Sequence, residues 1–252
     1  MSRILAVDAG NTRVKCAVVE DGAVLEQWSF LTRHVRSKVR GALSRVDLPV
    51  VLASVVPAVT KAVSAWCESS GRELFVITSK NQTLLKANDE LGADLLAAAA
   101  AAFKLHAKGR PVAVIGLGTA ITLTAIAGDG TFRGALFTLG MKQTRDTLAA
   151  RCALLDHAAT TAPSSVLLGN DTRSCMDNGV LLATVGIARA YADQARRELG
   201  SDALIVATGG DSALVAPLAN AYQRRKAINI VDNELTLKGI YLLAGERRCS
   251  SC

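Results

Sequence analysis

The feature that most constrains the fold of this chain is a short pattern that occurs twice. Residues 7–15, VDAGNTRVK, align with residues 115–123, IGLGTAITL. Each segment has a strand, a glycine-containing turn with a small polar residue, and a second strand. A repeated hairpin at the head of each half predicts a duplication, which gives two related α/β domains facing each other across a cleft. Chance similarity between two short segments is the alternative.

Apolar runs and turn residues predict alternating strands and helices. The first third has strands at 4–7, 14–19, 23–30 and 50–53, the last leading to a helix that Pro57 opens. After Pro111 the order repeats, with strands at 112–115, 121–126 and 132–137, a helix from about Met141, a helix over 176–199, a strand over 203–207, and helices over 212–221 and 235–244. The polar residues 86–89 mark the predicted boundary between domains 1–88 and 89–252.

A predicted helix over residues 89–108 contains an alanine run from Ala97 to Ala102. So smooth a helix face lets another helix approach closely. We expect this face at a domain or subunit interface rather than in solvent.

Composition limits the classes of function. Of 252 residues, 50% are hydrophobic, 20% charged and only 4% aromatic, with a net charge of +7. This balance favours a globular protein that attracts a small anionic molecule over one that stacks on nucleic-acid bases. The basic stretch Arg33–Arg40 is interpreted as a solvated helix face. No apolar run could span a membrane, and the start Met1-Ser2-Arg3 lacks signal-peptide features, so we expect a soluble cytoplasmic protein.

Six cysteines in a chain of this length do not predict a disulfide scaffold. Cys16, Cys67 and Cys152 lie in apolar patterns and are expected to be buried thiols, while Cys175 receives no role. Cys249 and Cys252 form a C-x-x-C pair, which is too little for a metal site without a second Cys or His pair.

The first hairpin has the residues that a phosphate-binding turn requires. Gly10 lets a phosphate approach the backbone, Asn11 and Thr12 can donate hydrogen bonds, and Lys15 adds positive charge. Asp8 ends the strand, where its carboxylate could orient hydrated Mg²⁺. An ordinary hairpin turn is the alternative for this motif taken alone.

The second hairpin supplies Gly118 and Thr119, and a later strand ends in Gly209 and Gly210. Two phosphate clamps across a cleft, followed by a Gly-Gly turn for the nucleoside, predict a nucleoside triphosphate site without a Walker loop.

This combination resembles the superfamily of actin, hexokinase and the heat-shock chaperone ATPases, and more closely the type III pantothenate kinases, including the Bvg accessory factors. The motifs that carry the resemblance are Asp8–Thr12, Ser54–Pro57, Leu91–Asp94, Gly118–Thr122, Asp129-Gly130, Gly140, Thr172 with Gly179, Thr208–Gly210 and Leu235–Gly239.

The resemblance implies two RNase H-like domains of the actin/hexokinase type and phosphorylation of pantothenate by ATP with Mg²⁺, the first step towards coenzyme A. It also implies that Asp94 is the general base and that Gly92, Ala93, Leu95 and Thr172 contact the substrate. A homodimer with the pantothenate pocket at the subunit interface is implied as well.

The chain departs from the family pattern around the acceptor. Leu95 replaces an arginine that helps to hold the substrate, and Leu85 stands where the family has a pocket tyrosine. Gly116 replaces an aspartate that holds a monovalent cation, K⁺ or NH₄⁺, so we expect little dependence on that ion. Basic residues that could replace the lost arginine are Lys86, Arg133, Lys142 and Arg145. A non-catalytic, nucleotide-binding regulatory or accessory factor, or a kinase for another small hydroxylated acceptor, is the competing hypothesis.

Overall fold

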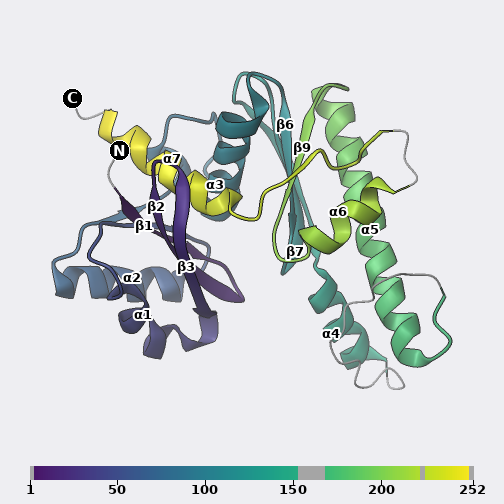
Figure 1. The fold of residues 1–252 in the computed structure, drawn as a ribbon, viewed down its shortest axis with the longest axis horizontal. Coiled ribbons are helices and arrows are strands. Elements are labelled where there is room, and N and C mark those ends of the chain that lie inside the picture. Colours follow the sequence, from purple (N-terminus) through teal and green to yellow (C-terminus); the bar gives the residue numbers. More distant parts are fainter. Residues whose placement is uncertain (1–2, 153–167, 222–224, 250–252) are drawn as a thin grey trace. The chain divides into compact units, whose positions relative to one another are not determined.

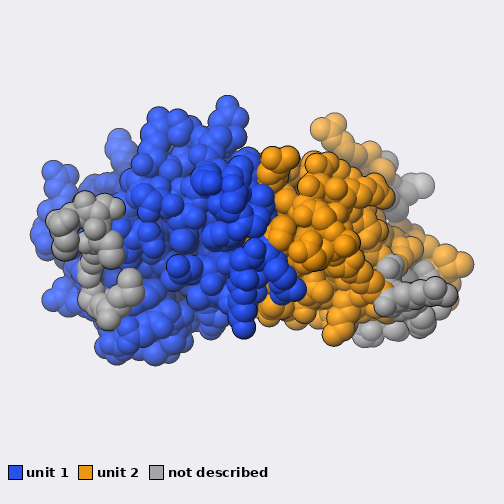
Figure 2. Space-filling model, turned by 90° about the horizontal axis from the view of Figure 1, so that it is seen from above, with its two compact units in different colours: residues 1–110, 126–132, 234–252 blue, residues 111–125, 133–233 orange. Residues whose placement is uncertain are grey.

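The computed structural model describes residues 3–152, 168–221 and 225–249, without the side chains of the last three. The chain forms two compact units, coloured separately in Figure 2. Unit 1 comprises residues 1–110, 126–132 and 234–252, and unit 2 comprises residues 111–125 and 133–233.

Unit 1 contains a five-stranded mixed sheet (Figure 1). In spatial order its strands are β3 (Ala23–Leu31), β2 (Arg13–Glu20), β1 (Ile4–Ala9), β4 (Val50–Ser54) and β5 (Leu74–Val76). Strands β1 and β2 and strands β2 and β3 pair antiparallel, whereas β1 with β4 and β4 with β5 pair parallel. The predicted strands of the first third are therefore confirmed, and β5 is added to them.

Helices cover both faces of this sheet. Leu5, Val7 and Ala9 of β1 join a buried core with helices α1 (Val35–Leu43) and α2 (Pro57–Ser70). Because side chains alternate along a strand, Asp8 points to the opposite face. That face packs against α3 (Ala93–Ala101) and α7 (Leu235–Cys249) (Figure 1). Short 3₁₀ turns cover Thr32–His34 and Ser79–Asn81.

The alanine run packs against another helix inside unit 1 rather than facing solvent. Ala97 to Ala102 are all buried, and α3 lies against α7. A Cβ on Gly239 of α7 would lie 1.8 Å from the carbonyl oxygen of Ala97, so the two backbones are in contact. The helix begins at Ala93 rather than at residue 89, and a π-helix over Ala102–Ala107 continues it.

Unit 2 repeats the strand order of unit 1. Its sheet contains, in spatial order, β8 (Phe132–Leu139), β7 (Ala120–Ile126), β6 (Val112–Leu117), β9 (Leu204–Thr208) and β10 (Ile230–Val231). Strands β6, β9 and β10 are parallel neighbours, as β1, β4 and β5 are in unit 1. This shared topology agrees with the predicted duplication.

Helices α4 (Met141–Arg151), α5 (Thr172–Leu199) and α6 (Ser212–Asn220) belong to unit 2. Residues of α5 and α6 and Met141 form one buried core with β6, β7 and β9. Helix α5 begins four residues before the predicted start because Asp171 caps it, accepting a hydrogen bond from Ser174 N at 2.9 Å.

The compact units are grouped differently from the domains predicted at residues 1–88 and 89–252. The reason is α3 with α7: both pack beside the first sheet, although they follow residue 88 in the sequence. The division of the chain at residue 88 stays a prediction.

The cysteine predictions are partly confirmed. Cys16 and Cys67 are buried free thiols, but Cys152, which follows the end of α4, is exposed. Cys175 is also exposed, and Cys252 lies outside the described residues together with the side chain of Cys249. Among the described residues, no helix is both long and apolar enough to cross a membrane.

Candidate active site

Asp8 is the most buried of the charged residues in the first hairpin. It pairs across the sheet with Lys15 on β2 and with Ala53 on β4. Lys15 Nζ lies 4.0 Å from Oδ2 of Asp8, and the Asp8 side chain is 13% exposed. The predicted phosphate-binding lysine therefore extends towards the predicted metal-orienting carboxylate.

Burial raises the pKa of Asp8 from 3.8 to about 6. The charge of Lys15 lowers this pKa and the charge of Asp94 raises it, so burial outweighs the lysine. The two carboxylates are thus within electrostatic reach of each other in unit 1. A buried carboxylate with so little compensation favours a further cation beside it.

Thr32 fixes the turn between β1 and β2 through two hydrogen bonds. The Thr32 hydroxyl donates to the carbonyl of Gly10 at 2.7 Å, and its N–H donates to the carbonyl of Thr12 at 3.0 Å. Asn11 and Thr12 are exposed. A Cβ on Gly10 would meet only the carbonyl oxygen of Arg13 at 3.5 Å, an ordinary contact. The turn itself therefore does not require glycine, whereas close approach of a ligand to the backbone would.

Asp94 lies in the first turn of α3, whose N-terminal cap is Gly92. Its Oδ1 accepts a hydrogen bond from the N–H of Leu95 at 2.8 Å. Burial raises the pKa of Asp94, and this hydrogen bond lowers it. A Cβ on Gly92 would lie 3.0 Å from that Oδ1 and 3.2 Å from Val55 Cγ1. Glycine therefore leaves the space that the Asp94 carboxylate occupies, while Ala93 is buried beside it.

Three turns of unit 2 meet through their backbones. The N–H of Gly140 donates to the carbonyl of Thr119 at 3.0 Å, and a Cβ on Gly140 would lie 1.8 Å from the carbonyl oxygen of Gly118. Gly209 has φ +104, and a Cβ there would lie 2.3 Å from the carbonyl oxygen of Leu117. Both contacts exclude any side chain, so Gly140 and Gly209 are required for this arrangement.

The Gly-Gly turn opens helix α6. The N–H of Asp211 donates to the carbonyl of Leu117 at 3.1 Å, which fixes the turn to the second hairpin. The hydroxyl of Ser212 donates to the carbonyl of Gly209 at 2.7 Å. Gly210 is exposed, and a Cβ there would touch nothing within 4 Å. The turn thus presents open backbone at Gly210.

Thr172, the remaining predicted substrate contact, begins α5 and is exposed. It lines a pocket of about 660 Å³ between α4 and α5. The lining residues are Leu148, Gly169, Asn170, Asp171, Thr172, Cys175 and Met176. None of the described glycine turns of unit 2 contributes to this lining.

Three of the four basic residues considered as substitutes for the missing arginine are bound to aspartates. The pairs are Lys86 with Asp129 at 3.0 Å, Lys142 with Asp146 at 2.5 Å and Arg145 with Asp177 at 2.7 Å. Arg133 is exposed on β8 and remains a candidate. Leu85, at the position of the family tyrosine, is buried, with its N–H and carbonyl bonded to the side chain of Gln82.

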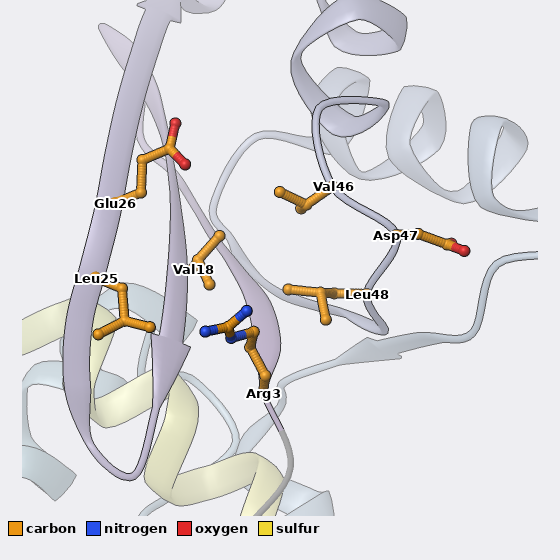
Figure 3. Close-up of a pocket in the computed structure, with 7 residues that line it drawn as sticks. All are labelled: Arg3, Val18, Leu25, Glu26, Val46, Asp47 and Leu48. Atoms are coloured by element: carbon orange, nitrogen blue, oxygen red, sulfur yellow. The ribbon is translucent and has the colours of Figure 1, made fainter.

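Unit 1 has another pocket, shown in Figure 3. It lies beside Arg3 and Val18, at the start of β1, whereas Asp8 lies near the end of that strand. Its volume is about 460 Å³, and its lining residues are Arg3, Val18, Leu25, Glu26, Val46, Asp47 and Leu48. A β-bulge leaves Leu25 without a partner on β2. Arg72 holds the facing loop through the carbonyls of Val46 and Leu48. Sequence reasoning missed this pocket, which shares no residue with the candidate site.

The described side chains include no cluster of three or more His, Cys, Asp or Glu residues that could hold a metal ion by themselves. Any cation at Asp8 would therefore be held jointly with a ligand. Chemically, unit 1 offers two coupled carboxylates beside an exposed donor turn, and unit 2 offers a backbone surface built from glycine turns. These are the elements needed to bind a polyphosphate and to accept a proton.

Comparison with known proteins gives one family. The sequence pattern of the type III pantothenate kinases matches residues 4–194. A type III pantothenate kinase from Paramagnetospirillum magneticum is 31% identical over 256 residues, covering 94% of this chain and 95% of that protein. A type III pantothenate kinase from Bacillus cytotoxicus is 30% identical over 257 residues, covering 95% of each.

Solved structures agree in fold. A protein described as a Baf family transcriptional activator from Campylobacter jejuni superposes with a TM-score of 0.62 at 13% identity, covering 98% of this chain and 100% of that chain. A ROK family glucokinase from Streptomyces griseus, in complex with glucose and AMPPNP, gives 0.54 at 16% identity, covering 98% of this chain and 100% of that chain. The two five-stranded mixed sheets thus form an actin/hexokinase-like fold.

Proposed function

The chain belongs to the type III pantothenate kinase family and is a phosphotransferase of that family, and we propose which of its residues carry the transfer of phosphate from ATP to pantothenate. Family membership implies ATP as the donor. The observation that carries the assignment of roles is the electrostatic coupling of two partly buried carboxylates, Asp8 and Asp94, beside the first hairpin of unit 1.

The nucleotide-binding residues proposed here come from three turns. They are Asp8, Gly10, Asn11, Thr12 and Lys15 from unit 1, and Gly118, Thr119, Gly209 and Gly210 from unit 2. In unit 1 the assignment is supported by the exposed hydrogen-bond donors Asn11 and Thr12 near Lys15. In unit 2 it is supported by the exposed backbone of Gly210, next to glycine turns that pack closely together.

Mg²⁺ fits the surroundings of Asp8. The carboxylate is largely buried, its pKa is raised to about 6, and among the described residues Lys15 forms an ion pair with it only at a long 4.0 Å. A divalent ion there would offset the charge of the phosphates and of the carboxylate. A carboxylate oxygen of Asp8 would hold the ion. The ion would then replace Lys15 as the positive charge beside Asp8, and Lys15 would contact a phosphate.

Asp94 is proposed as the general base. Burial raises the pKa of its carboxyl above the ordinary aspartate value, which makes the carboxylate a better proton acceptor. The hydrogen bond from the N–H of Leu95 fixes the orientation of the Asp94 carboxylate, and the missing side chain of Gly92 leaves room for it. In the reaction Asp94 accepts the proton of the primary hydroxyl while that oxygen forms its bond to the γ-phosphorus and the bond to the β–γ bridging oxygen breaks.

The acceptor pocket is the part of the site that differs from the family pattern. Leu95 cannot pair with a carboxylate, and Leu85 is buried rather than lining a pocket. We propose that Gly92, Ala93, Leu95 and Thr172 contact the acceptor, and that the chain acts as a homodimer. The same two leucines support a second candidate, a kinase for another small hydroxylated acceptor. A regulatory relative that only binds nucleotide is a third.

The test is ADP release with pantothenate and with a panel of hydroxylated acids and sugars, for the unmodified chain and Asp94→Asn. The amide keeps the shape of the carboxylate but accepts no proton, so we expect turnover to fall by about 10²–10⁴ and ATP affinity to stay within a few-fold. Asp89→Asn is the matched control, because Asp89 is an exposed carboxylate near the same helix, paired with Lys80. Full turnover by Asp94→Asn would refute its role as base.

A further inference from the structure

The pocket at the start of β1 has two walls of different origin (Figure 3). On one side the β-bulge in β3 leaves Leu25 unpaired, and the Leu25 side chain is 53% exposed. On the other side Arg72 fixes the loop before β4, donating to the carbonyls of Val46 at 2.7 Å and Leu48 at 3.1 Å. Bulges are frequent next to active sites, where they redirect a side chain. The volume of about 460 Å³ is in the range of small-molecule sites.

The floor of this pocket is apolar and has an opposite charge on each side. Val18 of β2 is 5% exposed and lies directly opposite Glu26 of β3. Both residues face the side of the sheet that α1 and α2 cover, because Cys16 and Trp28, two residues further along the same two strands, contact that core. Arg3 directly precedes β1, on the other side of β2 from β3. Its guanidinium points into the pocket beside Val18 (Figure 3).

In the described chain these two charges are not paired with each other. Arg3 binds Glu20 through one amino group at 2.9 Å, and a guanidinium has five N–H donors in all. The Glu26 carboxylate has no hydrogen-bond or ion-pair partner among the described residues. Asp47 also lines the pocket, but its carboxylate points away from it (Figure 3) and pairs with Arg72 at 2.9 Å. The pocket therefore offers a free carboxylate, spare guanidinium donors and an apolar surface between them.

We propose that this pocket binds a small zwitterion whose ammonium and carboxylate groups are separated by an apolar segment. The ammonium pairs with Glu26, the carboxylate pairs with Arg3, and the apolar segment lies on Val18. A neutral apolar molecule would take water from the Glu26 carboxylate without replacing it, and an anion or a cation alone would meet a like charge. The pocket shares no residue with the candidate active site, so this inference does not depend on the proposed kinase reaction.

The first test compares three ligands with the same number of carbon atoms on the full chain, by ligand-observed NMR titration. They are ε-aminocaproate, which is the zwitterion, caproate, which lacks the ammonium, and hexylamine, which lacks the carboxylate. Each lost charge-assisted contact should weaken binding, so we expect ε-aminocaproate to bind about tenfold more tightly than either of the others. Equal affinities of the three ligands would overturn the inference, as would the absence of saturable binding of ε-aminocaproate up to about 50 mM.

Variants of exposed side chains locate the site, because Arg3 and Glu26 can be changed without opening the core. Glu26→Gln and Arg3→Gln should each weaken ε-aminocaproate about tenfold, while the melting temperature and the ADP Kd stay as in the unmodified chain. Glu20→Gln is the matched control: it removes the partner of Arg3 from outside the pocket, so the affinity should stay the same or rise.

Unchanged binding in Glu26→Gln would overturn the inference, and so would an equal loss in Glu20→Gln, which would indicate a general effect of charge. Failure of the proposed function looks different. A chain that binds ε-aminocaproate but no nucleotide would refute the proposed kinase and support this site, and a chain that binds nucleotide but not ε-aminocaproate would do the reverse.

Discussion

Replacing Asp8 by asparagine should make unit 1 more stable while weakening its binding of Mg·ATP. The pKa of Asp8 rises from 3.8 to about 6 on folding, a shift of about 2 units. A pKa difference of 1 corresponds to about 1.36 kcal/mol, so ionised Asp8 costs the folded state about 3 kcal/mol at neutral pH. Asparagine is nearly the same size and carries no charge. It should recover much of this energy and lose the oxygen ligand proposed for the cation.

The sign of the pH dependence follows from the direction of the shift. A carboxyl with a raised folded-state pKa stabilises the fold below its unfolded pKa of 3.8, and that contribution is lost as pH rises towards about 6. The advantage of Asp8→Asn should therefore be absent near pH 4, grow up to pH 6 and level off above it.

Tryptophan fluorescence can follow this unfolding selectively, because both tryptophans of the chain, Trp28 and Trp66, lie in unit 1. Urea unfolding at several pH values, without nucleotide, gives the stability, and calorimetry gives the Mg·ATP affinity. Asp129→Asn is the contrasting control, since hydrogen bonds from Lys86 and Thr131 lower its pKa to about 2 and removing its charge should destabilise the unit. Equal stability of Asp8→Asn and the unmodified chain at pH 7.5 would refute the argument, and so would an advantage that does not depend on pH.

Three further changes test other parts of the structure. Leu95→Arg offers a guanidinium to a carboxylate acceptor, so the KM for pantothenate should fall; a higher KM in ADP-release assays would indicate a pocket shaped for another acceptor. Gly116 offers no carboxylate, so any activity should respond little to K⁺ over Na⁺ at fixed ionic strength. A Cβ there would lie 2.5 Å from Thr122 Oγ1, so Gly116→Asp should introduce K⁺ dependence only together with Thr122→Ala, and strong K⁺ activation of the unmodified chain would contradict this. Gly239→Ala should lower the melting temperature markedly, because its Cβ would lie 1.8 Å from the carbonyl oxygen of Ala97, and an unchanged melting curve would show that the helices can separate at no cost.

The strands that position the site could be predicted from the sequence because apolar runs and turn residues are local signals. Strands β5 and β10 were missed, since three and two residues are too short to show a period. The start of α3 was placed too early, because the polar residues before Gly92 look like a first helical turn when the tertiary structure is unknown.

The residues of the candidate site could be proposed from the sequence where they lie in short motifs. Asp8 and its turn stand in one segment, and so do Gly92 and Asp94. The role of α7 as the partner of the alanine run was not predictable, because Gly239 and Ala97 are far apart in the chain. The pair of Arg145 and Asp177 was missed for the same reason: single residues on two helices carry no spacing signal.

The packing of α3 against α7 has a consequence for how the chain folds while it is being synthesised. Asp94 is made early, but the helix that covers α3 is encoded after the whole of unit 2. During translation, unit 2 can therefore close its own sheet while unit 1 still exposes the alanine face of α3. Contacts between such distant segments form slowly. The candidate base would gain its final surroundings only when the ribosome has delivered α7, so a nascent chain would hold the glycine turns of unit 2 before it can catalyse anything.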